Sequence, residues 1–488
     1  MAKFPDPTKQ YTATPLSSAI STSRQEPNPP AETIEQPPVS AEPPVAAPPP
    51  PPATPTPLPI SPSPFRNLLP IILGVGVFIV LGFLAFTLLP RLRSKPDSLI
   101  TLTYWGLWEP ASVMQTVIAD YERDHPNVKI NYSQQSPKNY RSRLVSSIES
   151  GTGPDIARIH NTWLPMLKKH LSPKPASVAL DLSDYYPVVQ ADFVEGGNLY
   201  AAPLEIDGLA LYYNKDILNE AGATPPSDWD TLRKLAFDLT KRNPETKIIE
   251  RAGVALGTAN NVDFWSDILG LLILQNSGDP GNPSETAVRD ALTYYTIFSL
   301  SDKSWDSTQP SSVYAFATGT TAMIIAPSWV IPEITAINPS LNYGVAPAPV
   351  LPNVNKAWAT YWAEAVPSGS KNPTAAWEFL QYLSRPEVLQ KLYTTAAQIR
   401  PIGEPYPLRS LASSLESDPL VAPFVSQGSS YVSWYLSSRT YDEGVNDEII
   451  KYYEDTINAM NDGSGLGSVE RTLEEGVKQV MAKYSLAN

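Results

Sequence analysis

Cysteine is absent from the 488-residue chain, and histidine occurs only three times, as His125, His160 and His170. A chain without cysteine can form no disulfide and offers no thiol nucleophile. The ligands that most often hold zinc or iron–sulfur clusters are therefore missing or scarce. The sequence predicts neither a metal site nor a cofactor.

Positive charge is also scarce. The 36 Lys and Arg residues are outnumbered by 49 Asp and Glu residues, which gives a net charge of −13. Binding to nucleic-acid phosphates requires a surface rich in Lys and Arg, so this composition argues against a nucleic-acid partner. The chain also contains no GxSxG, no HExxH and no P-loop, three motifs that indicate hydrolytic or nucleotide-dependent enzymes.

The chain contains one long hydrophobic run, LLPIILGVGVFIVLGFLAFTLL, at residues 68–89. As a helix these uncharged residues would extend about 33 Å, enough to cross a hydrocarbon core of about 30 Å. A cleaved signal peptide does not fit, because 67 residues precede the run and no Ala-x-Ala site follows it. The run predicts a single transmembrane helix over 68–90 that anchors the chain in the lipid bilayer.

The segments on either side of this run have a different composition. Residues 1–67 contain 20 of the 52 prolines and are predicted to form a disordered tail with polyproline II character. Residues 91–98 form a short tether to the rest of the chain. Arg66 precedes the run, whereas Arg91, Arg93 and Lys95 follow it, so the positive-inside rule taken alone places the large domain in the cytoplasm. We expect the opposite orientation, with the large domain outside, because large domains can be translocated despite such charges.

From Leu99 onward, short apolar strands alternate with amphipathic helices. The runs LITLTYW, VKINYS and DIARI predict three strands, and the segments between them predict helices near 111–125 and 140–150. This βαβαβ order is typical of a doubly wound α/β domain. Further helices are expected from Pro373, with Asn372 as N-cap, and at about 446–460 and 468–485.

Four blocks of the sequence resemble one family. PLEIDGLALYYNKDILNEAG at 203–222 is similar to the characteristic segment of the extracellular solute-binding protein family 1, which includes maltose-binding protein. It departs at Glu205, where the family usually has a small residue, Asn or Asp. PPSDWDTLRKLAFDL, FATGTTAMIIAPSW and WAEAVPSGSKNPTAAWEFLQYL resemble three further blocks in the same order. The resemblance extends from about Leu99 to the end of the chain.

The resemblance implies a domain arrangement and a function that the residues alone do not specify. The family's fold is a two-lobed α/β periplasmic-binding-protein fold, with the ligand held between lobes that are joined by three crossing segments. On this chain the crossings are expected near 207–211, 320–325 and 361–366. Residues 99–207 and 326–360 would then form lobe 1, and residues 208–325 and 361–488 would form lobe 2. The implied function is a receptor that delivers a small ligand, a carbohydrate, to the permease subunits of an ABC importer.

Binding a sugar requires flat apolar surfaces for its C–H faces and polar groups for its hydroxyls. We therefore expect the ligand to contact aromatic and acidic residues at strand ends and crossings. A single tryptophan in such a domain is more often part of a lobe core, as expected for Trp229 and Trp377. The candidate ligand-binding residues are Trp105, Trp108, Glu109, Asn161, Trp163, Glu205, Asp207, Trp265, Trp329, Tyr361, Trp362, Arg400 and Trp434.

Three other functions remain open at this point. Glu205 with Glu109 or Glu364 could form the carboxylate pair of a glycosidase, but no hydrolase motif supports an enzyme. A binding module for sensing or adhesion, without a transporter, would have the same lobes. A receptor for a peptide or a polyamine would differ only in the residues that line its site.

Overall fold

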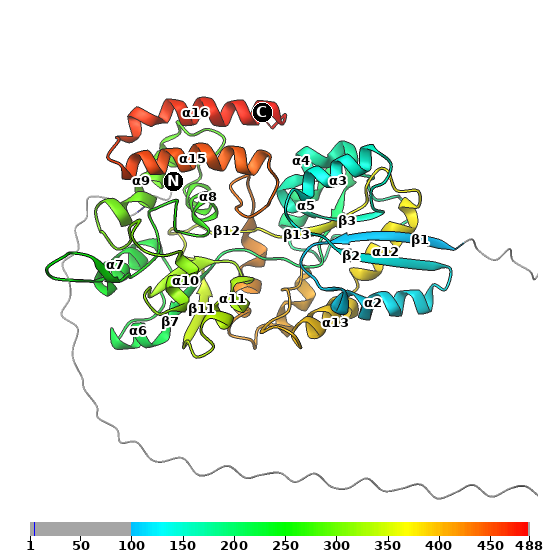
Figure 1. Ribbon diagram of the computed structural model, residues 1–488, viewed down its shortest axis with the longest axis horizontal. Coiled ribbons are helices and arrows are strands. Elements are labelled where there is room, and N and C mark those ends of the chain that lie inside the picture. Colours follow the sequence, from blue (N-terminus) through cyan, green and yellow to red (C-terminus); the bar gives the residue numbers. More distant parts are fainter. Residues whose placement is uncertain (1–3, 5–98, 487–488) are drawn as a thin grey trace, which may run out of the picture. The chain divides into compact units, whose positions relative to one another are not determined.

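The computed structural model describes residue 4 and residues 99–486. The expected tail over 1–67, transmembrane helix over 68–90 and tether over 91–98 lie outside the described residues, except for Phe4. Among the helices of the described residues, none is both long enough and apolar enough to cross a membrane. The domain that starts at Leu99 has the two-lobed α/β periplasmic-binding-protein fold (Figure 1).

The first lobe is built on a five-stranded sheet with the order β2-β1-β3-β13-β6. β1, β2 and β3 are parallel, and β13 runs antiparallel to both β3 and β6. This confirms the predicted βαβαβ opening. The strands are β1 (Ile100–Gly106), β2 (Val128–Gln134), β3 (Ile156–His160), β6 (Ala201–Ala202) and β13 (Trp362–Ala365).

Helices cover both faces of this sheet. Figure 1 shows α3, α4 and α5 on one side and α2, α12 and α13 on the other, where α2 contacts both α12 and α13. The helices are α2 (Ala111–Asp124), α3 (Tyr140–Glu149), α4 (Leu164–Leu167), α5 (Pro187–Phe193), α12 (Pro373–Leu383) and α13 (Pro386–Ala396). α12 starts at the predicted proline, but Asn372 makes no side-chain capping hydrogen bond.

The second lobe is built on a smaller sheet with the order β10-β7-β11, in which both outer strands run antiparallel to the central one. The strands are β7 (Ala210–Asn214), β10 (Met323–Ala326) and β11 (Tyr343–Pro347). The helices are α6 (Lys215–Glu220), α7 (Trp229–Leu239), α8 (Trp265–Gln275), α9 (Thr286–Leu300), α10 (Ser312–Ala317), α11 (Val330–Ile337), α14 (Ala422–Gln427), α15 (Val445–Asn461) and α16 (Leu466–Lys483).

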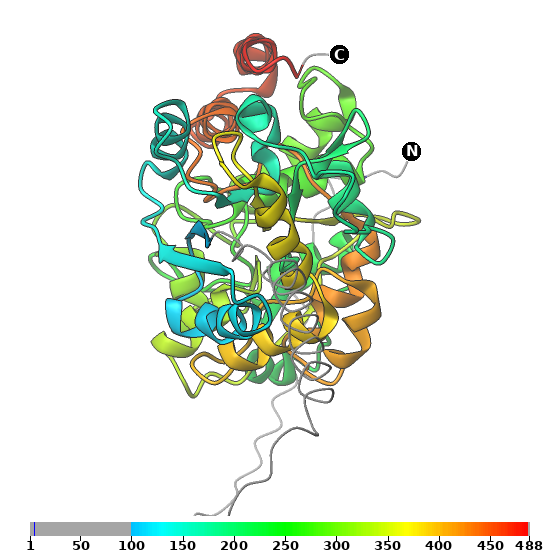
Figure 2. The ribbon, with the colours of Figure 1, turned by 90° about the vertical axis from the view of Figure 1, so that its right-hand side faces the viewer.

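The last two helices confirm the amphipathic segments expected near the end of the chain. α15 and α16 pack against each other at one end of the domain, and Figure 2, which looks onto the first lobe, shows the same pair. α15 buries Ile449, Tyr453 and Ile457, which are four residues apart and so lie on one helical face. Short strand pairs complete the fold: β4 (Val194–Glu195) with β5 (Asn198–Leu199), β8 (Lys241–Arg242) with β9 (Ile249–Arg251), and β12 (Ala357–Trp358) with β14 (Tyr431–Val432).

The strand pairings divide the chain differently from the lobe boundaries expected above. Residues 326–360, expected in lobe 1, include β11, which pairs with β7 in the second lobe. Residues 361–396, expected in lobe 2, include β13 in the first sheet and the two helices that pack near α2. The expected crossing at 320–325 is also wrong, since β10 is a strand of the second sheet. A short apolar run such as MIIA does not reveal which sheet it joins, because its hydrogen-bond partners lie far away in sequence.

Two segments cross side by side between the sheets. Leu209 N donates to Trp358 O at 3.1 Å, and Thr360 N donates to Asp207 O at 3.0 Å. Gly208 lies between these bonds, and a Cβ atom there would be 2.0 Å from Trp358 O. Only glycine allows the two backbones to approach this closely.

Candidate ligand-binding site

An aromatic cluster lies at the carboxyl edge of the first sheet. Because β13 is antiparallel to β3, its first residue, Trp362, pairs with His160 at the end of β3. The Trp362 ring is 5.0 Å from His160, 5.3 Å from Trp163 and 5.4 Å from Trp108, measured between centroids. The T-shaped geometry of these contacts is a favourable one for aromatic pairs.

The second lobe adds Tyr441 to this cluster. Its ring lies 5.9 Å from that of Trp108, which follows β1 in the first lobe. Tyr441 is 41% exposed and has a φ of 54°, a backbone angle that is uncommon for residues other than glycine. Trp108 is half-buried, whereas Trp163 and Trp362 are buried. Trp108 and Tyr441 are therefore the members of the cluster with ring surface to offer a ligand.

Contacts between the lobes hold the segment that carries Tyr441. Arg141 of α3 donates to the carbonyl oxygen of Asp442, and Asn446 Nδ2 donates to Thr162 Oγ1 at 2.7 Å. Asp442 is buried, and its carboxylate accepts hydrogen bonds from Gly444 N, just before α15, and from Asn446 N in its first turn. Sequence reasoning missed Tyr441, because nothing in SSRTYDEG marks it as a residue held in this backbone conformation.

A second aromatic group lies within the second lobe. Trp329, which directly precedes α11, is half-buried and lies 6.1 Å from Phe264. The Arg439 guanidinium is 4.7 Å from the Phe264 ring centroid and pairs with Asp263 at 2.7 Å. Trp265, in contrast, is buried at the start of α8.

A group of charged residues surrounds Glu364, which follows Trp362 by two positions in β13. These residues form a pocket. Glu364 accepts a hydrogen bond from Tyr104 Oη at 2.8 Å and lies 2.9 Å from Arg158 Nε. Arg158 also lies 3.6 Å from Glu205, measured from Nη2 to Oε2. Since alternate residues of a strand face the same side, Glu364 and Trp362 share one face of the sheet. The charged pocket therefore continues from the aromatic cluster.

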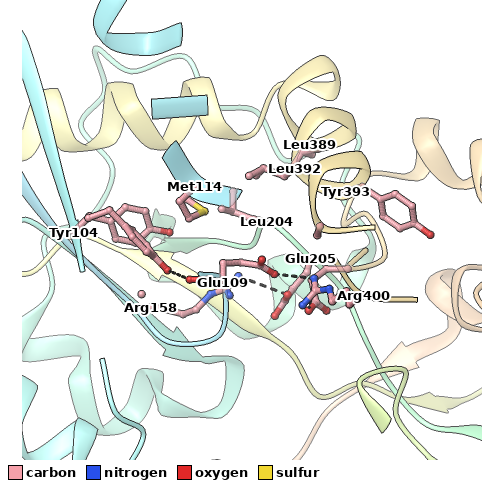
Figure 3. A pocket seen from close by; sticks show the side chains of 14 residues that line it. Tyr104, Glu109, Met114, Arg158, Leu204, Glu205, Leu389, Leu392, Tyr393 and Arg400 are labelled. Carbon is pink, nitrogen blue, oxygen red and sulfur yellow. Dashed lines mark hydrogen bonds and ion pairs between the residues drawn. The ribbon is translucent and has the colours of Figure 1, made fainter. Parts of the chain in front are cut away.

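A second guanidinium, that of Arg400, lies at the mouth of this pocket, which we call the acidic pocket. Arg400 Nη2 lies 2.9 Å from Glu109 Oε1 and 3.0 Å from Glu404 Oε1. Figure 3 shows Glu109, Glu205, Arg158 and Arg400 gathered on one side, with the apolar side chains of the lining on the other. The acidic pocket encloses about 30 Å³.

Burial dominates the electrostatics of this pocket. It raises the pKa of Glu205 well above its usual range, although the positive charge of Arg158 opposes the shift. Burial also raises the pKa of Glu364 and of Glu109, and repulsion from Glu404 adds to the shift of Glu109. For Arg158, burial disfavours the charge, but attraction by Glu205 and Glu364 outweighs it and raises the pKa.

Two of the expected site residues, Asn161 and Tyr361, hydrogen-bond to Asp192 beside the crossing segments and make no ring contact with Trp108. Asn161 Nδ2 and Tyr361 Oη both donate to Asp192 Oδ2, at 2.9 Å and 2.7 Å, and Ser433 Oγ donates to Oδ1. Asp192 thus links α5 to the crossing segment and to the segment after β14, and burial raises its pKa to about 6. Asn161 and Trp434 line a separate groove of about 790 Å³ beside Asp192.

Asp207, another expected site residue, is hydrogen-bonded within the protein at the first crossing. Its carboxylate accepts hydrogen bonds from Ser328 Oγ at 2.6 Å, Ser328 N at 3.0 Å and Gly208 N at 2.7 Å. Burial raises the pKa of this carboxyl to about 8. These bonds tie the first crossing to the end of β10.

The candidate residues predicted from the sequence therefore do not form one site but lie in several different parts of the domain. Trp108, Trp163 and Trp362 form the aromatic cluster, and Glu109, Glu205 and Arg400 line the acidic pocket. Trp105 is half-buried and contacts Tyr140 at 6.5 Å, outside the cluster. Among residues 99–486, no group of three or more His, Asp or Glu side chains is placed to hold a metal ion.

Two relatives of this chain are named as binding proteins, and the second is named for its ligand. A putative binding protein of Brucella abortus (strain 2308) is 25% identical over 278 residues, 54% of this chain and 66% of the relative. A maltotriose-binding protein of Pyrococcus abyssi is 23% identical over 323 residues, 62% of this chain and 66% of the relative. The chain thus spans slightly less than two thirds of the length of these relatives.

Solved structures agree with the fold. The sugar-binding protein MalE of Xanthomonas citri superposes with a TM-score of 0.66 at 22% identity, covering 79% of this chain and 98% of that one. The GacH receptor of Streptomyces glaucescens has a TM-score of 0.61 at 21% identity, covering 79% and 99%. The model of the bacterial extracellular solute-binding protein family matches residues 106–390, more than half of the chain. The chain belongs to the bacterial extracellular solute-binding protein family.

Proposed function

We propose that this protein is a receptor that captures a carbohydrate outside the cytoplasm and delivers it to the permease subunits of an ABC importer. The observation that carries the proposal is the contact between Trp108 and Tyr441, which joins ring surface from the two lobes. Sugars present C–H faces that pack well on aromatic rings. Relatives named for maltotriose and for sugar binding support a carbohydrate ligand.

The division of ring surface between the lobes also supports a transport role. A ligand that contacts Trp108 and Tyr441 together binds one relative arrangement of the lobes better than others, and so shifts the lobes toward it. Asp192 and Asp207 hydrogen-bond to other side chains, namely those of Asn161, Tyr361 and Ser328 at the crossing segments. Binding and hinge movement would then use different residues.

The location of the receptor is part of the proposal. We propose that residues 68–89 anchor the chain in the membrane and that the domain from Leu99 onward faces the outside, where an import receptor meets its ligand. The anchor rests on the sequence, since these residues lie outside the described structure. Protease added to intact cells should digest the large domain and spare a tag at the N-terminus; the reverse pattern would exclude an import receptor.

A thermal-shift screen of the full-length protein in detergent tests the ligand class. Neutral oligosaccharides, peptides and polyamines are compared, and a ligand at 100 times its Kd should add about 2.7 kcal/mol to the free energy of unfolding. We expect oligosaccharides to give the shift. Stabilisation by peptides or polyamines alone would refute the carbohydrate proposal.

Variants of two tryptophans test the position of the site. Trp108→Ala should weaken binding of the identified ligand more than about tenfold, or about 1.4 kcal/mol, whereas Trp434→Ala should not. The reverse result would place the ligand in the groove beside Asp192.

Solution scattering and recovery of the ligand test the transport role. The radius of gyration should be smaller with ligand, and the ligand should be recovered chemically unchanged. Binding without compaction favours a sensing or adhesion module, and turnover of the ligand favours an enzyme.

A further inference from the structure

The acidic pocket contains more negative than positive groups. Two guanidiniums face four carboxylates, which come from the loop after β1, the first crossing, β13 and the segment after α13: Glu109, Glu205, Glu364 and Glu404. Even if each guanidinium fully offsets one carboxylate, two carboxylates are left over. A buried excess charge of one sign is costly unless a counter-charge or a proton neutralises it.

Of the four carboxylates, three have an oxygen that accepts no hydrogen bond from the described residues, and two of these three, Glu205 and Glu109, line the cavity itself. Glu205 and Glu109 are only 4% and 8% exposed, and both line the pocket. Within the described residues, Glu205 Oε2 and Glu109 Oε2 accept no hydrogen bond, although each carboxylate lies beside a guanidinium. Buried carboxylate oxygens normally have hydrogen-bond donors, so this pair indicates a donor that is supplied from outside the chain.

The shape of the pocket limits what that donor can be. Its volume of about 30 Å³ has room for one or two groups the size of a water molecule. The pocket also has a way in, because the side chains of Arg400 and Glu404 at its mouth are each 22% exposed, whereas Arg158 and Glu364 at its floor are 4% and 0% exposed. A single small polar group can enter, and a whole sugar ring cannot.

The charge of the donor follows from its neighbours. An –NH3⁺ group is small, carries three N–H donors and no acceptor, and supplies the missing positive charge. No set of three acidic or histidine side chains within residues 99–486 is arranged to hold a metal ion, so the pocket does not offer a metal coordination shell. A hydroxyl would fit the volume but would leave the excess charge in place.

We propose that the acidic pocket binds the protonated primary amine of a ligand whose sugar face packs on the neighbouring aromatic cluster. The ligand class is then an amino sugar, with the amine between Glu109 and Glu205. This inference rests on the proposed carbohydrate receptor and narrows its ligand. Burial raises the pKa of both carboxyls, so protons neutralise part of the cluster when the amine is absent.

Small ammonium ions probe the pocket without knowledge of the sugar. In full-length protein, about 100 mM ammonium or methylammonium chloride should raise the melting temperature by about 1–3 °C relative to sodium chloride of equal ionic strength. Tetramethylammonium chloride should not, because the ion lacks N–H donors and exceeds the pocket. Equal melting temperatures in ammonium and sodium salts would overturn the proposal.

Substitutions locate the effect. Glu205→Gln and Glu109→Gln should each abolish the difference between ammonium and sodium salts, whereas Glu416→Gln at an exposed position should keep it. Two pocket variants are used because one of them can fail to fold. If a folded pocket variant retains the full ammonium effect, the ion binds elsewhere and the proposal is wrong.

A comparison of sugars completes the test and separates this inference from the proposed function. Among oligosaccharides that bind, the form with a free amine should bind at least about tenfold tighter than its N-acetylated form, and Glu205→Gln should remove this preference. If neutral sugars bind and ammonium has no effect, the receptor proposal stands and the amine site falls. If ammonium stabilises the protein and no sugar binds, the amine site stands and the carbohydrate proposal falls.

Discussion

The buried guanidinium of Arg158 gives the sharpest prediction about what stabilises the site. Its Nε lies 2.9 Å from Glu364, and its Nη2 lies 3.6 Å from Glu205. All three side chains are nearly inaccessible, with exposures of 4%, 0% and 5%. Arg158→Met keeps most of the apolar volume and leaves the two carboxyls without this partner.

The expected magnitude follows from the uncompensated charge. Removal of one partner from a buried ion pair costs about 3–5 kcal/mol, because the remaining charge stays buried. We therefore expect Arg158→Met to lower the free energy of unfolding by about 3–5 kcal/mol, measured by urea denaturation with an unchanged slope. Glu364→Gln should cost less, about 1–3 kcal/mol, since it leaves Tyr104 a carbonyl oxygen to donate to.

The double variant tests the reasoning. If Arg158 and Glu364 act as a pair, Arg158→Met with Glu364→Gln should be more stable than the sum of the two single effects by at least about 1 kcal/mol. A single Arg158→Met effect below about 1 kcal/mol, or simple additivity, would refute the view that the pair is buried and mutually dependent. Exposed pairs such as Arg471 with Glu475, at 88% and 72% exposure, should show almost no coupling.

Three further predictions concern the cluster and the hinge. Tyr441→Gly should weaken ligand binding several-fold, as measured by calorimetry, yet raise stability by up to about 1 kcal/mol, because glycine adopts the φ of 54° without strain; a loss of stability would contradict a strained conformation. The raised pKa of Asp192, about 6, means that its contribution to stability is present below its unfolded pKa of about 4 and is lost as the pH rises through 6. Denaturation between pH 4 and 8 should therefore show a fall in the wild type that is smaller in Asp192→Asn; equal slopes would exclude the shift. Gly208→Ala should destabilise the fold by more than about 2 kcal/mol, since its Cβ would be 2.0 Å from Trp358 O, and a neutral result in thermal denaturation would mean that the crossings separate easily.

The lobe boundaries show what local sequence can and cannot specify. Strands and helices with strong apolar periodicity were predicted correctly, as in βαβαβ at the start of the domain and in α15 and α16. Their partners were not: the crossing expected at 320–325 overlaps β10, which is a strand of the second sheet. Periodicity reports which face of an element is buried, whereas the sheet that it joins depends on hydrogen bonds between residues more than 100 positions apart.

The candidate site shows the same difference between what local sequence and what tertiary structure determine. Trp108 and Glu109 are candidates because they follow the first predicted strand, at whose carboxyl end ligands bind in α/β sheets. Glu205 and Trp362 are candidates because the family resemblance places them at crossings between the lobes. Only the tertiary structure decided which of these lie together, with two tryptophans in the cluster and both carboxyls in the acidic pocket. It also placed the rings of Trp108 and Tyr441 5.9 Å apart across 333 positions and turned Tyr361 toward Asp192. Such contacts depend on backbone angles and on packing between distant segments, and a single sequence records neither.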